Sequence, residues 1–469
     1  MSRKPRAIVI IQSDQHRADC LGIAGYPGLQ TPNLDRLAQN GILFRNAFSP
    51  APVCVPARSC LESSQWPCQH EVIHNWDGPS PKYLSPDIST WAKAFTSSSW
   101  TCDYIGRWHV HPNKTPVDYG YSSYLSDHNY YQWRIDQGLV KAPEVSAEIG
   151  VSAFLGSTDS EIAPEASQLS WLTDQVISKI EERMGSNDAF LIRLDTFAPH
   201  LPNRVPEPYA SMYPPESLEP WGSFVETFQD KPYIQKQQLK TWNIDQYSWK
   251  DWAPTVSRYL GEITLLDHQI GRIMDTLKAH SILDDTLIVY TSDHGDMCGG
   301  HRMLDKHFIM YDDVTRVPLI AHWPNGIKSN NDCNAFISSA VDLGPTLCEI
   351  AEVKIPESFR GTSYANVFRD ETFQGREDIY STYDGNQFGL YTQRMIRNKR
   401  WKYVWNATDI DELYDLEEDP HELSNLVNNT HYADTLSQLR KRLVHWLEET
   451  KDPMANAWIV PTLLEDRIQ

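Results

Sequence analysis

The sequence lacks any long apolar run, any paired cysteine motif and any excess of positive charge. The apolar run nearest the N-terminus, Ala7–Ile11, is far too short for a membrane span or for the core of a signal peptide. The eight cysteines show no CxxC spacing, which excludes a typical zinc site and a disulfide scaffold. With 42 Lys and Arg against 62 Asp and Glu, the net charge is −20. Such a charge repels phosphates, so we expect no nucleic-acid partner and no membrane partner.

The missing signal peptide also bears on location. We expect a cytoplasmic protein from the sequence as given, and a periplasmic or secreted one if an export signal was trimmed from it.

Several short apolar runs end abruptly in polar residues, and amphipathic helices are expected between them. Runs of this length with β-branched residues predict buried parallel strands. The runs are Ala7–Ile11, Ala189–Leu194, Thr286–Tyr290 and Pro318–Trp323. Apolar residues at helical spacing predict helices over roughly 165–182 and 259–277. The fold class expected is α/β, with a large, mostly parallel sheet sandwiched by helices.

The chain divides into two expected parts. Residues 1–370 form the main domain, and residues 371–469 form a smaller C-terminal α+β subdomain. In the second part, Gln393–Trp405 predicts short antiparallel strands and Ala433–Thr450 predicts an amphipathic helix. Within the first part, two aromatic-rich stretches, Tyr119–Ser160 and Glu207–Ala253, are expected to be long loops or lids.

The most specific pattern is Cys54–Arg58, whose Cys-x-Pro-x-Arg spacing resembles the signature of the formylglycine-dependent sulfatases of the alkaline phosphatase superfamily. The resemblance implies that a maturation enzyme oxidises Cys54 to formylglycine, whose hydrate is the nucleophile. One hydroxyl of this gem-diol attacks sulfur, and the other later expels sulfate by reforming the aldehyde, which a plain thiol cannot do. After Arg58 the family usually continues toward Leu-Thr-Gly, whereas Leu61–Ser64 follows here. That stretch helps the maturation enzyme recognise its target.

The resemblance also implies one divalent cation. Asp14, Asp293 and His294 follow predicted strands and look like the family's metal ligands, and Gln15 is expected to supply an amide oxygen. Carboxylate and amide oxygens suit Ca²⁺, whereas imidazole also suits Mn²⁺. Many members have Asp where Gln15 stands and Asn where His294 stands, so we expect calcium and keep manganese as the alternative. The alternative to a metal-binding role for Asp14 is that its side chain only caps the start of a helix.

The segment Gly106–His109 resembles the family's Gly-Lys-Trp-His element, with Arg107 in place of lysine. Arginine keeps the positive charge and offers two parallel donors to sulfate oxygens. By the resemblance, His109 takes the proton from the sulfated hydrate and triggers release of sulfate.

Further matches concern the leaving group. Ala198–Pro202 resembles a Pro-His-x-Pro element, whose histidine, His200, faces the leaving-group oxygen. Lys306 resembles the lysine that pairs with it. We expect a protonated His200 and a cationic Lys306 to stabilise the alkoxide that forms as the ester breaks. Asn75 is a candidate contact to the sulfate or the sugar.

Together these matches run from Asp14 to about Leu426. They include Thr31–Leu37, Arg316–Leu319 and Asp411–Pro420. The function implied is a sulfatase acting on a small anionic substrate, expected to be a sulfated saccharide because sugar faces stack on Trp and Tyr. Two alternatives stay open at this point. One is a phosphonate monoester or phosphodiester hydrolase of the same superfamily, whose members carry Tyr and Thr where Arg107 and His109 stand. The other is a non-catalytic binding protein on the sulfatase fold.

Overall fold

A computed structural model describes residues 4–76, 81–139, 156–328, 331–385 and 389–464 of the chain. The strands are β1 (Ala7–Ser13), β2 (Ile42–Phe48), β3 (Thr101–Gly106), β4 (Ser123–Ser126), β5 (Gly156–Thr158), β6 (Phe190–Asp195), β7 (Asn203–Val205), β8 (Thr286–Ser292), β9 (Leu319–His322), β10 (Asn331–Ser338), β11 (Ile379–Gly385), β12 (Tyr391–Arg397), β13 (Trp401–Asn406) and β14 (Glu412–Asp415). The helices are α1 (Pro32–Gln39), α2 (Cys54–Ser63), α3 (Pro67–His70), α4 (Trp91–Ser97), α5 (Asn129–Asp136), α6 (Gln168–Met184), α7 (Tyr233–Thr241), α8 (Trp249–Ala279), α9 (Asp312–Thr315), α10 (Leu343–Ile350), α11 (Ala365–Phe368), α12 (Ala433–Thr450) and α13 (Ile459–Leu464).

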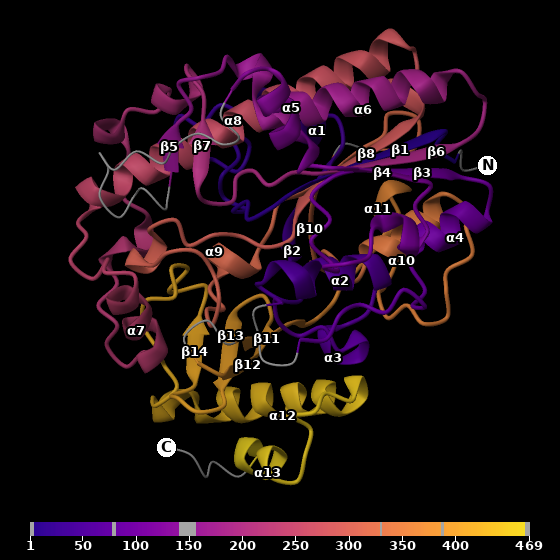
Figure 1. Ribbon diagram of the computed structural model, residues 1–469. Helices are drawn as coiled ribbons and strands as arrows, with labels where there is room; N and C mark the ends of the chain where they lie inside the picture. Colours follow the sequence, from indigo (N-terminus) through magenta and orange to yellow (C-terminus); the bar gives the residue numbers. More distant parts are fainter. Residues whose placement is uncertain (1–3, 77–80, 140–155, 329–330, 386–388, 465–469) are drawn as a thin grey trace.

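An eight-stranded sheet forms the centre of the main body, in the order β10-β2-β9-β8-β1-β6-β3-β4 (Figure 1). Strand β1 pairs in parallel with β6 and β8, and β3 pairs in parallel with β4 and β6. The carboxyl ends of β1, β3, β6 and β8 therefore meet at one edge of the sheet, where ligands of open α/β sheets bind. The expected α/β fold with a mostly parallel sheet is confirmed.

The expectation of a parallel strand at Pro318–Trp323 is wrong in direction. Strand β9 lies antiparallel to both of its neighbours, β2 and β8. The physical reason is that every residue of β9 is buried, so the run has the continuous apolar pattern that any strand covered on both faces acquires. Such a pattern reports burial and carries no information on strand direction.

Helices cover both faces of the sheet (Figure 1). A separate apolar core lies between the sheet and the helices on each face. Strand β1 alternates between the two: Val9 and Ile11 pack with α1, α6 and α8, whereas Ile8 and Ile10 pack with α2, α4 and α10. Helix α8 confirms the helix predicted over residues 259–277. The apolar residues from Tyr259 to Leu277 that share one face of it are all buried. Helix α6 confirms the other predicted helix.

The aromatic stretches contain more regular structure than expected. The first includes β4 and α5, the second includes α7, and α8 already begins at Trp249; residues 140–155 of the first lie outside the described residues. Tyr130 and Trp252 are buried in the packing of α5 and α8. Large aromatic rings on helices and strands, as well as those in loops, fill the protein interior, so a high aromatic content does not distinguish a loop from a regular element.

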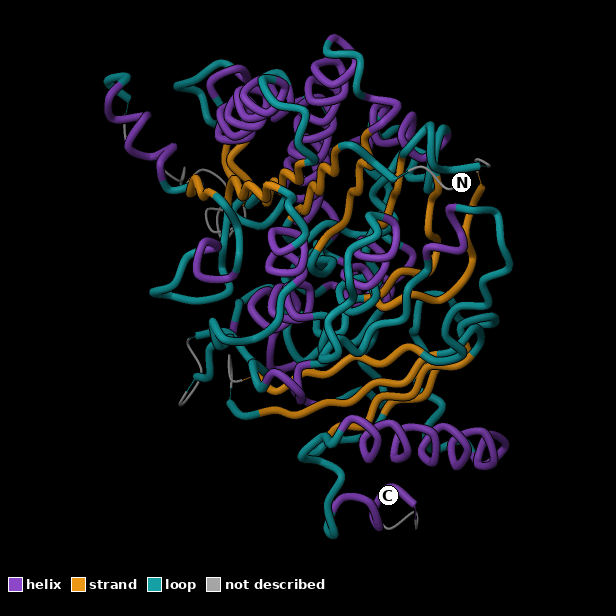
Figure 2. The backbone as a smooth tube through the Cα atoms, turned by 90° about the vertical axis from the view of Figure 1, so that its right-hand side faces the viewer, coloured by secondary structure: helices purple, strands orange, loops and turns teal. Residues whose placement is uncertain are grey.

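Beyond the main body lies a four-stranded antiparallel sheet, β11-β12-β13-β14, with α12 against its outer face (Figure 2). This confirms the short antiparallel strands and the terminal helix expected after residue 370, and the bounds of α12 are those expected. The division of the chain at that residue stays a prediction. No helix among the described residues is long and apolar enough to cross a bilayer.

Candidate active site

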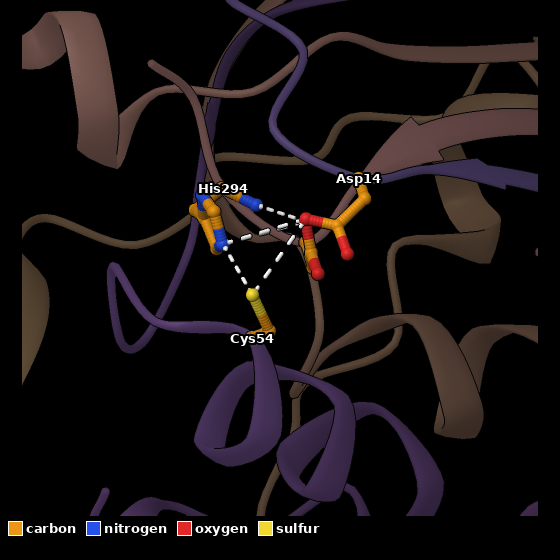
Figure 3. Close-up of side chains that lie close together, drawn as sticks. Asp14, Cys54 and His294 are labelled. Carbon is orange, nitrogen blue, oxygen red and sulfur yellow. Dashed lines mark hydrogen bonds and ion pairs between the residues drawn. The ribbon is translucent and has the colours of Figure 1, made fainter. Parts of the chain in front are cut away.

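Three strand ends and one helix start bring the candidate residues together. In the sheet register Ser13 lies beside Ser292, so the next residues along both strands, Asp14 and Asp293, are neighbours. Helix α2 begins at Cys54 and points its first turn at this edge (Figure 3). Strand β3 ends at Gly106 with φ +108°, and a Cβ there would lie 1.9 Å from the carbonyl oxygen of Asp195. Only glycine permits this close approach.

Asp14, Cys54, Asp293 and His294 form a buried cluster whose ligand atoms all lie within 4.8 Å of one another. Cys54 Sγ lies 3.6 Å from Asp14 Oδ1 and 3.2 Å from His294 Nε2 (Figure 3). Two carboxylates and an imidazole are a donor set that suits a divalent cation. The structure thus brings together three of the four expected metal ligands with the expected nucleophile.

The tautomer of His294 follows from its contacts. Its Nδ1 lies 2.9 Å from the carbonyl oxygen of Gly295, which can only accept, so Nδ1 carries the proton. The lone pair of Nε2 then faces Asp14 and Cys54. Burial lowers the pKa of His294, which keeps the ring neutral as a metal ligand must be.

Arg58 holds the carboxylates of the cluster in place. Its guanidinium is buried and donates to Asp293 Oδ2 at 2.9 Å, to Asp195 Oδ2 at 2.8 Å and to Asp14 Oδ2 at 3.0 Å. Burial raises the pKa of Asp14, but the nearby cationic groups outweigh it and leave the pKa well below the usual value. The carboxylate of Asp14 is therefore held ionised although it is buried, and the same guanidinium contacts the carboxylate of Asp293.

The side-chain amide of Gln15 makes hydrogen bonds to Lys306 and to two nearby carboxylates. Its Nε2 donates to Asp296 at 2.7 Å and to Asp305 at 2.8 Å, and its Oε1 accepts from Lys306 Nζ at 2.6 Å. All the hydrogen-bonding groups of the amide are thus used on the lysine side of the site. Gln15 positions Lys306, and its role as a metal ligand stays a prediction.

Lys306 and His200 are in direct contact, as expected, with 2.7 Å between Lys306 Nζ and His200 Nε2. Burial and the adjacent Lys306 charge lower the pKa of His200 to about 3. Burial would lower the pKa of Lys306, but Asp305 reverses the effect and raises it. In the free site the proton is therefore on Lys306 and His200 is neutral, whereas the sequence led us to expect a protonated His200.

The backbone around Lys306 is strained. Asp305 and His307 have φ of 65° and 73°, and Phe308 has a φ of 27°. Non-glycine residues in this region cost about 1–3 kcal/mol each and persist where the surroundings enforce them, often at functional sites.

Arg107 contacts both the cluster and His109. Arg107 Nε lies 3.5 Å from Asp14 Oδ2, and its Nη2 lies 3.2 Å from His109 Nδ1. Burial, together with the Arg107 charge, holds the pKa of His109 well below its usual value. The ring of Phe197 lies beneath the Arg107 guanidinium, 4.5 Å from its carbon to the ring centroid.

Asn75 lies beside the nucleophile but is occupied. Its Oδ1 accepts from the backbone N–H of Val55 at 3.1 Å and so holds the first turn of α2. The expected contact of Asn75 with sulfate or sugar stays a prediction.

Several residues of the site were missed from the sequence. Asp195 is the last residue of β6 and Asp296 comes shortly after β8, and this position at the end of an apolar run was the available signal for them. Phe197 and Trp76 gave no signal, because an aromatic residue in a loop has no distinguishing pattern. Trp76 meets His109 edge-on, with ring centroids 4.9 Å apart.

Comparisons with known proteins identify the family of the chain. The sulfatase family model matches residues 6–353, and a model described as "N-sulphoglucosamine sulphohydrolase, C-terminal" matches residues 299–449. The chain belongs to the sulfatase family and is a sulfuric ester hydrolase.

Individual relatives are similar over nearly their whole length. An "Arylsulfatase" of Clostridium perfringens is 29% identical, covering 94% of each chain. An "N-acetylglucosamine-6-O-sulfatase" of Bacteroides thetaiotaomicron is 26% identical, covering 95% of this chain and 86% of that one. Among solved structures, a phosphonate monoester hydrolase of Agrobacterium radiobacter superposes with a TM-score of 0.82 at 24% identity, covering 96% of each chain. At that identity the likeness shows the fold alone.

Proposed function

We propose that this protein hydrolyses a sulfate ester of a carbohydrate, through a formylglycine formed from Cys54 and with one divalent cation held by Asp14, Asp293 and His294. The observation that carries the proposal is the position of Cys54. Its sulfur lies among two carboxylates and an imidazole, within the electrostatic reach of Arg107 and Lys306. A sulfate group placed there would lie close to both cationic side chains.

The unmodified residue is unsuited to the chemistry. Burial and the adjacent Asp14 raise the pKa of the Cys54 thiol to about 12, so the thiol stays protonated and weakly nucleophilic at neutral pH. As formylglycine, the residue would supply a gem-diol nucleophile. The cation, when bound, would offset the negative charge of the sulfate and polarise an S–O bond.

The chain's own residues supply the remaining functions. Arg107 offers two parallel donors to sulfate oxygens. Lys306, held by Gln15 and His200, carries the proton or the charge that the departing oxygen requires. His109 is neutral and is therefore able to accept a proton after the leaving group has departed.

A carbohydrate is favoured by the cavity at the site entrance. This entrance cavity has a volume of about 470 Å³. Among its lining residues are the sulfate-facing pair Arg107 and His109 and the aromatic residues Trp76, Tyr124, Tyr131 and Phe197. Aromatic faces beside polar groups suit sugar rings. The relative named an N-acetylglucosamine-6-O-sulfatase supports the same class.

One experiment on the protein co-expressed with a formylglycine-generating enzyme tests the proposal. Peptide mass spectrometry should show that Cys54 has exchanged its sulfur and two hydrogens for one oxygen. The converted protein should hydrolyse 4-nitrophenyl sulfate with a higher kcat/KM than 4-nitrophenyl phenylphosphonate, and Cys54→Ala should remove both activities. A converted protein that prefers the phosphonate would reject the sulfatase assignment, and one without turnover would indicate a binding protein.

A further inference from the structure

A second cavity lies next to the entrance cavity. This side cavity has a volume of about 260 Å³ and lies between α5, the start of α6, β7 and α8, which are neighbours in Figure 1. Its lining includes Tyr131, Gln168, Phe197, Arg204 and Glu262. None of these residues belongs to the nucleophile or cation cluster.

The side cavity adjoins the entrance cavity, because Phe197 and Tyr131 line both. The Phe197 ring also contacts the His200 ring, with centroids 4.8 Å apart. Ala198 and Pro202, which flank His200 in the chain, line the side cavity as well. A ligand in the side cavity would therefore lie next to a ligand whose ester oxygen faces His200 and Lys306.

The side cavity offers hydrogen-bond donors without acceptors. Gln168 Nε2 and Arg204 Nε are buried and have no partner among the described residues. A buried donor left unpaired costs about 1–3 kcal/mol, so such groups are normally satisfied by a ligand or by water. Two such groups on one cavity indicate that its occupant carries acceptor oxygens.

The charges around the side cavity are balanced. Arg134 pairs with Asp159 and Glu161, each at 2.8 Å. Glu262 accepts from Asn203 Nδ2 at 2.7 Å, and burial raises the pKa of Glu262 to about 8 although the nearby Arg204 lowers it. The cavity therefore lacks the concentration of positive charge that Arg107 and Lys306 give the sulfate site, and it suits a neutral occupant.

Apolar side chains complete the lining, with Ile162, Leu169, Leu265 and the Phe197 ring facing the same space. A sugar ring has apolar faces and a polar edge of hydroxyls, which matches this combination.

We propose that the side cavity binds the neutral sugar unit adjoining the sulfated one, so that the protein acts on an oligosaccharide of two or more units. This inference rests on the proposed function. Gln168 and Arg204 bind the hydroxyls of that unit, and Phe197 lies where the two cavities adjoin.

The test compares matched substrates in matched variants. Gln168→Leu and Arg204→Met remove the unpaired donors at similar volume. Arg258→Met is the control, because Arg258 of α8 also has a buried Nε without a partner among the residues described but does not line the cavity. The substrates are a panel of sulfated monosaccharides, the disaccharides that extend each by one unsulfated unit, and 4-nitrophenyl sulfate.

Wild type should show a higher kcat/KM for at least one disaccharide than for its monosaccharide. Each cavity variant should reduce that preference about tenfold, which corresponds to about 1.4 kcal/mol, and should leave 4-nitrophenyl sulfate unaffected. The Arg258→Met variant should keep the preference.

Two results would overturn the proposal: no disaccharide preference in wild type, or a preference unchanged in both cavity variants. Failure of the proposed function gives a different result from failure of this inference. If the protein is not a sulfatase, the converted wild type should not turn over 4-nitrophenyl sulfate at all. Thermal melts of all variants identify any that do not fold, and soaking a crystal of wild type with the unsulfated disaccharide gives an independent readout of cavity occupancy.

Discussion

At the scale of single residues, the contact between Lys306 and His200 determines which side chain holds a proton before substrate binds. The Lys306 ammonium donates to His200 Nε2, so the histidine lone pair is occupied. Lys306 is thus the group with a proton to offer to the departing oxygen, and His200 and Gln15 fix its position.

This arrangement predicts a graded effect of Lys306→Met. A sugar alkoxide is a strong base and requires a proton, whereas nitrophenolate is a weak base and requires little help. The loss in single-turnover rate should therefore be about 10²-fold larger on a sulfated sugar than on 4-nitrophenyl sulfate. His200→Gln should show a smaller difference between the two substrates, since glutamine can still accept from Lys306. Equal losses on both substrates in Lys306→Met would contradict the assignment.

The cluster predicts cation binding that is measurable without catalysis. Calcium or manganese should raise the melting temperature of the wild type, because an ion that binds only the folded state stabilises it by mass action. Asp293→Asn should abolish the shift. Asp195→Asn is the matched control, because Asp195 also contacts Arg58 but lies outside the cluster. Chelation should also remove turnover. An undiminished shift in Asp293→Asn would place the ion elsewhere.

Glu262 predicts a pH dependence of stability. Its folded pKa of about 8 exceeds the unfolded value of 4.5, because burial disfavours the charged form. Its contribution is therefore fully present below pH 4.5 and is lost as the pH rises toward 8. Relative to Glu262→Gln, the wild type should lose about 4 kcal/mol of unfolding free energy across this range in urea titrations. Glu181→Gln, at an exposed position on α6, should show no such trend. A constant difference between pH 5 and 8 would contradict the elevated pKa.

At the scale of elements, α1 depends on α8 for its N-terminal cap. Thr31, the residue before α1, makes no side-chain cap to it. Asp267 of α8 accepts instead from the backbone N–H groups of Asn33, at 3.0 Å, and Leu34, at 2.7 Å. Orphan donors at a helix start are thus satisfied by a different helix, which holds the two helices together.

Asp267→Ala should lower the free energy of unfolding by about 2 kcal/mol, because it leaves these buried donors without an acceptor. Turnover per folded molecule should stay unchanged. Asp174→Ala on α6 is the control, since Asp174 makes an exposed ion pair with Arg272, and its loss should cost less than about 1 kcal/mol. Equal destabilisation by the two variants in denaturant titrations would refute the capping role.

The elements that could be predicted from the sequence are those in which the spacing of apolar residues follows directly from which residues are buried. The strand runs that precede Asp14 and Asp293, and helix α12, fall into this group. The direction of β9 could not be predicted, because pairing partners determine it. The orientation of the Gln15 amide could not be predicted either, since it depends on Asp296 and Asp305, 281 and 290 residues away in the chain. Motif spacing thus identifies which residues meet, and long-range hydrogen bonds decide where their donors and acceptors point.

At the scale of the whole molecule, the two sheets share one apolar core. Ile8 of β1 and Phe44 of β2 belong to the same cluster as Tyr403 of β13 and Leu443 of α12. A buried ionic contact adds to this connection: Lys402 Nζ lies 2.7 Å from Asp312 Oδ1 and 2.6 Å from Glu422 Oε1. Asp312 begins α9, shortly after the segment that contains Lys306. The C-terminal sheet therefore supports the loop on which Lys306 is positioned.

This shared core predicts that the protein unfolds in a single calorimetric transition, although the sequence predicts a separate C-terminal subdomain from residue 371. Lys402→Met should lower the stability of that one transition by about 3 kcal/mol, because the buried Glu422 carboxylate loses its cation, whereas Asp312 keeps its ion pair with Arg397. Lys399→Met, at an exposed position in the β12–β13 turn, should have no measurable effect. Activity of the Lys402→Met protein should fall in parallel with the order of the Lys306 loop, measured by hydrogen exchange of residues 303–311. Two separate transitions, of which Lys402→Met moves only one, would show that the segments before and after residue 370 unfold as independent domains.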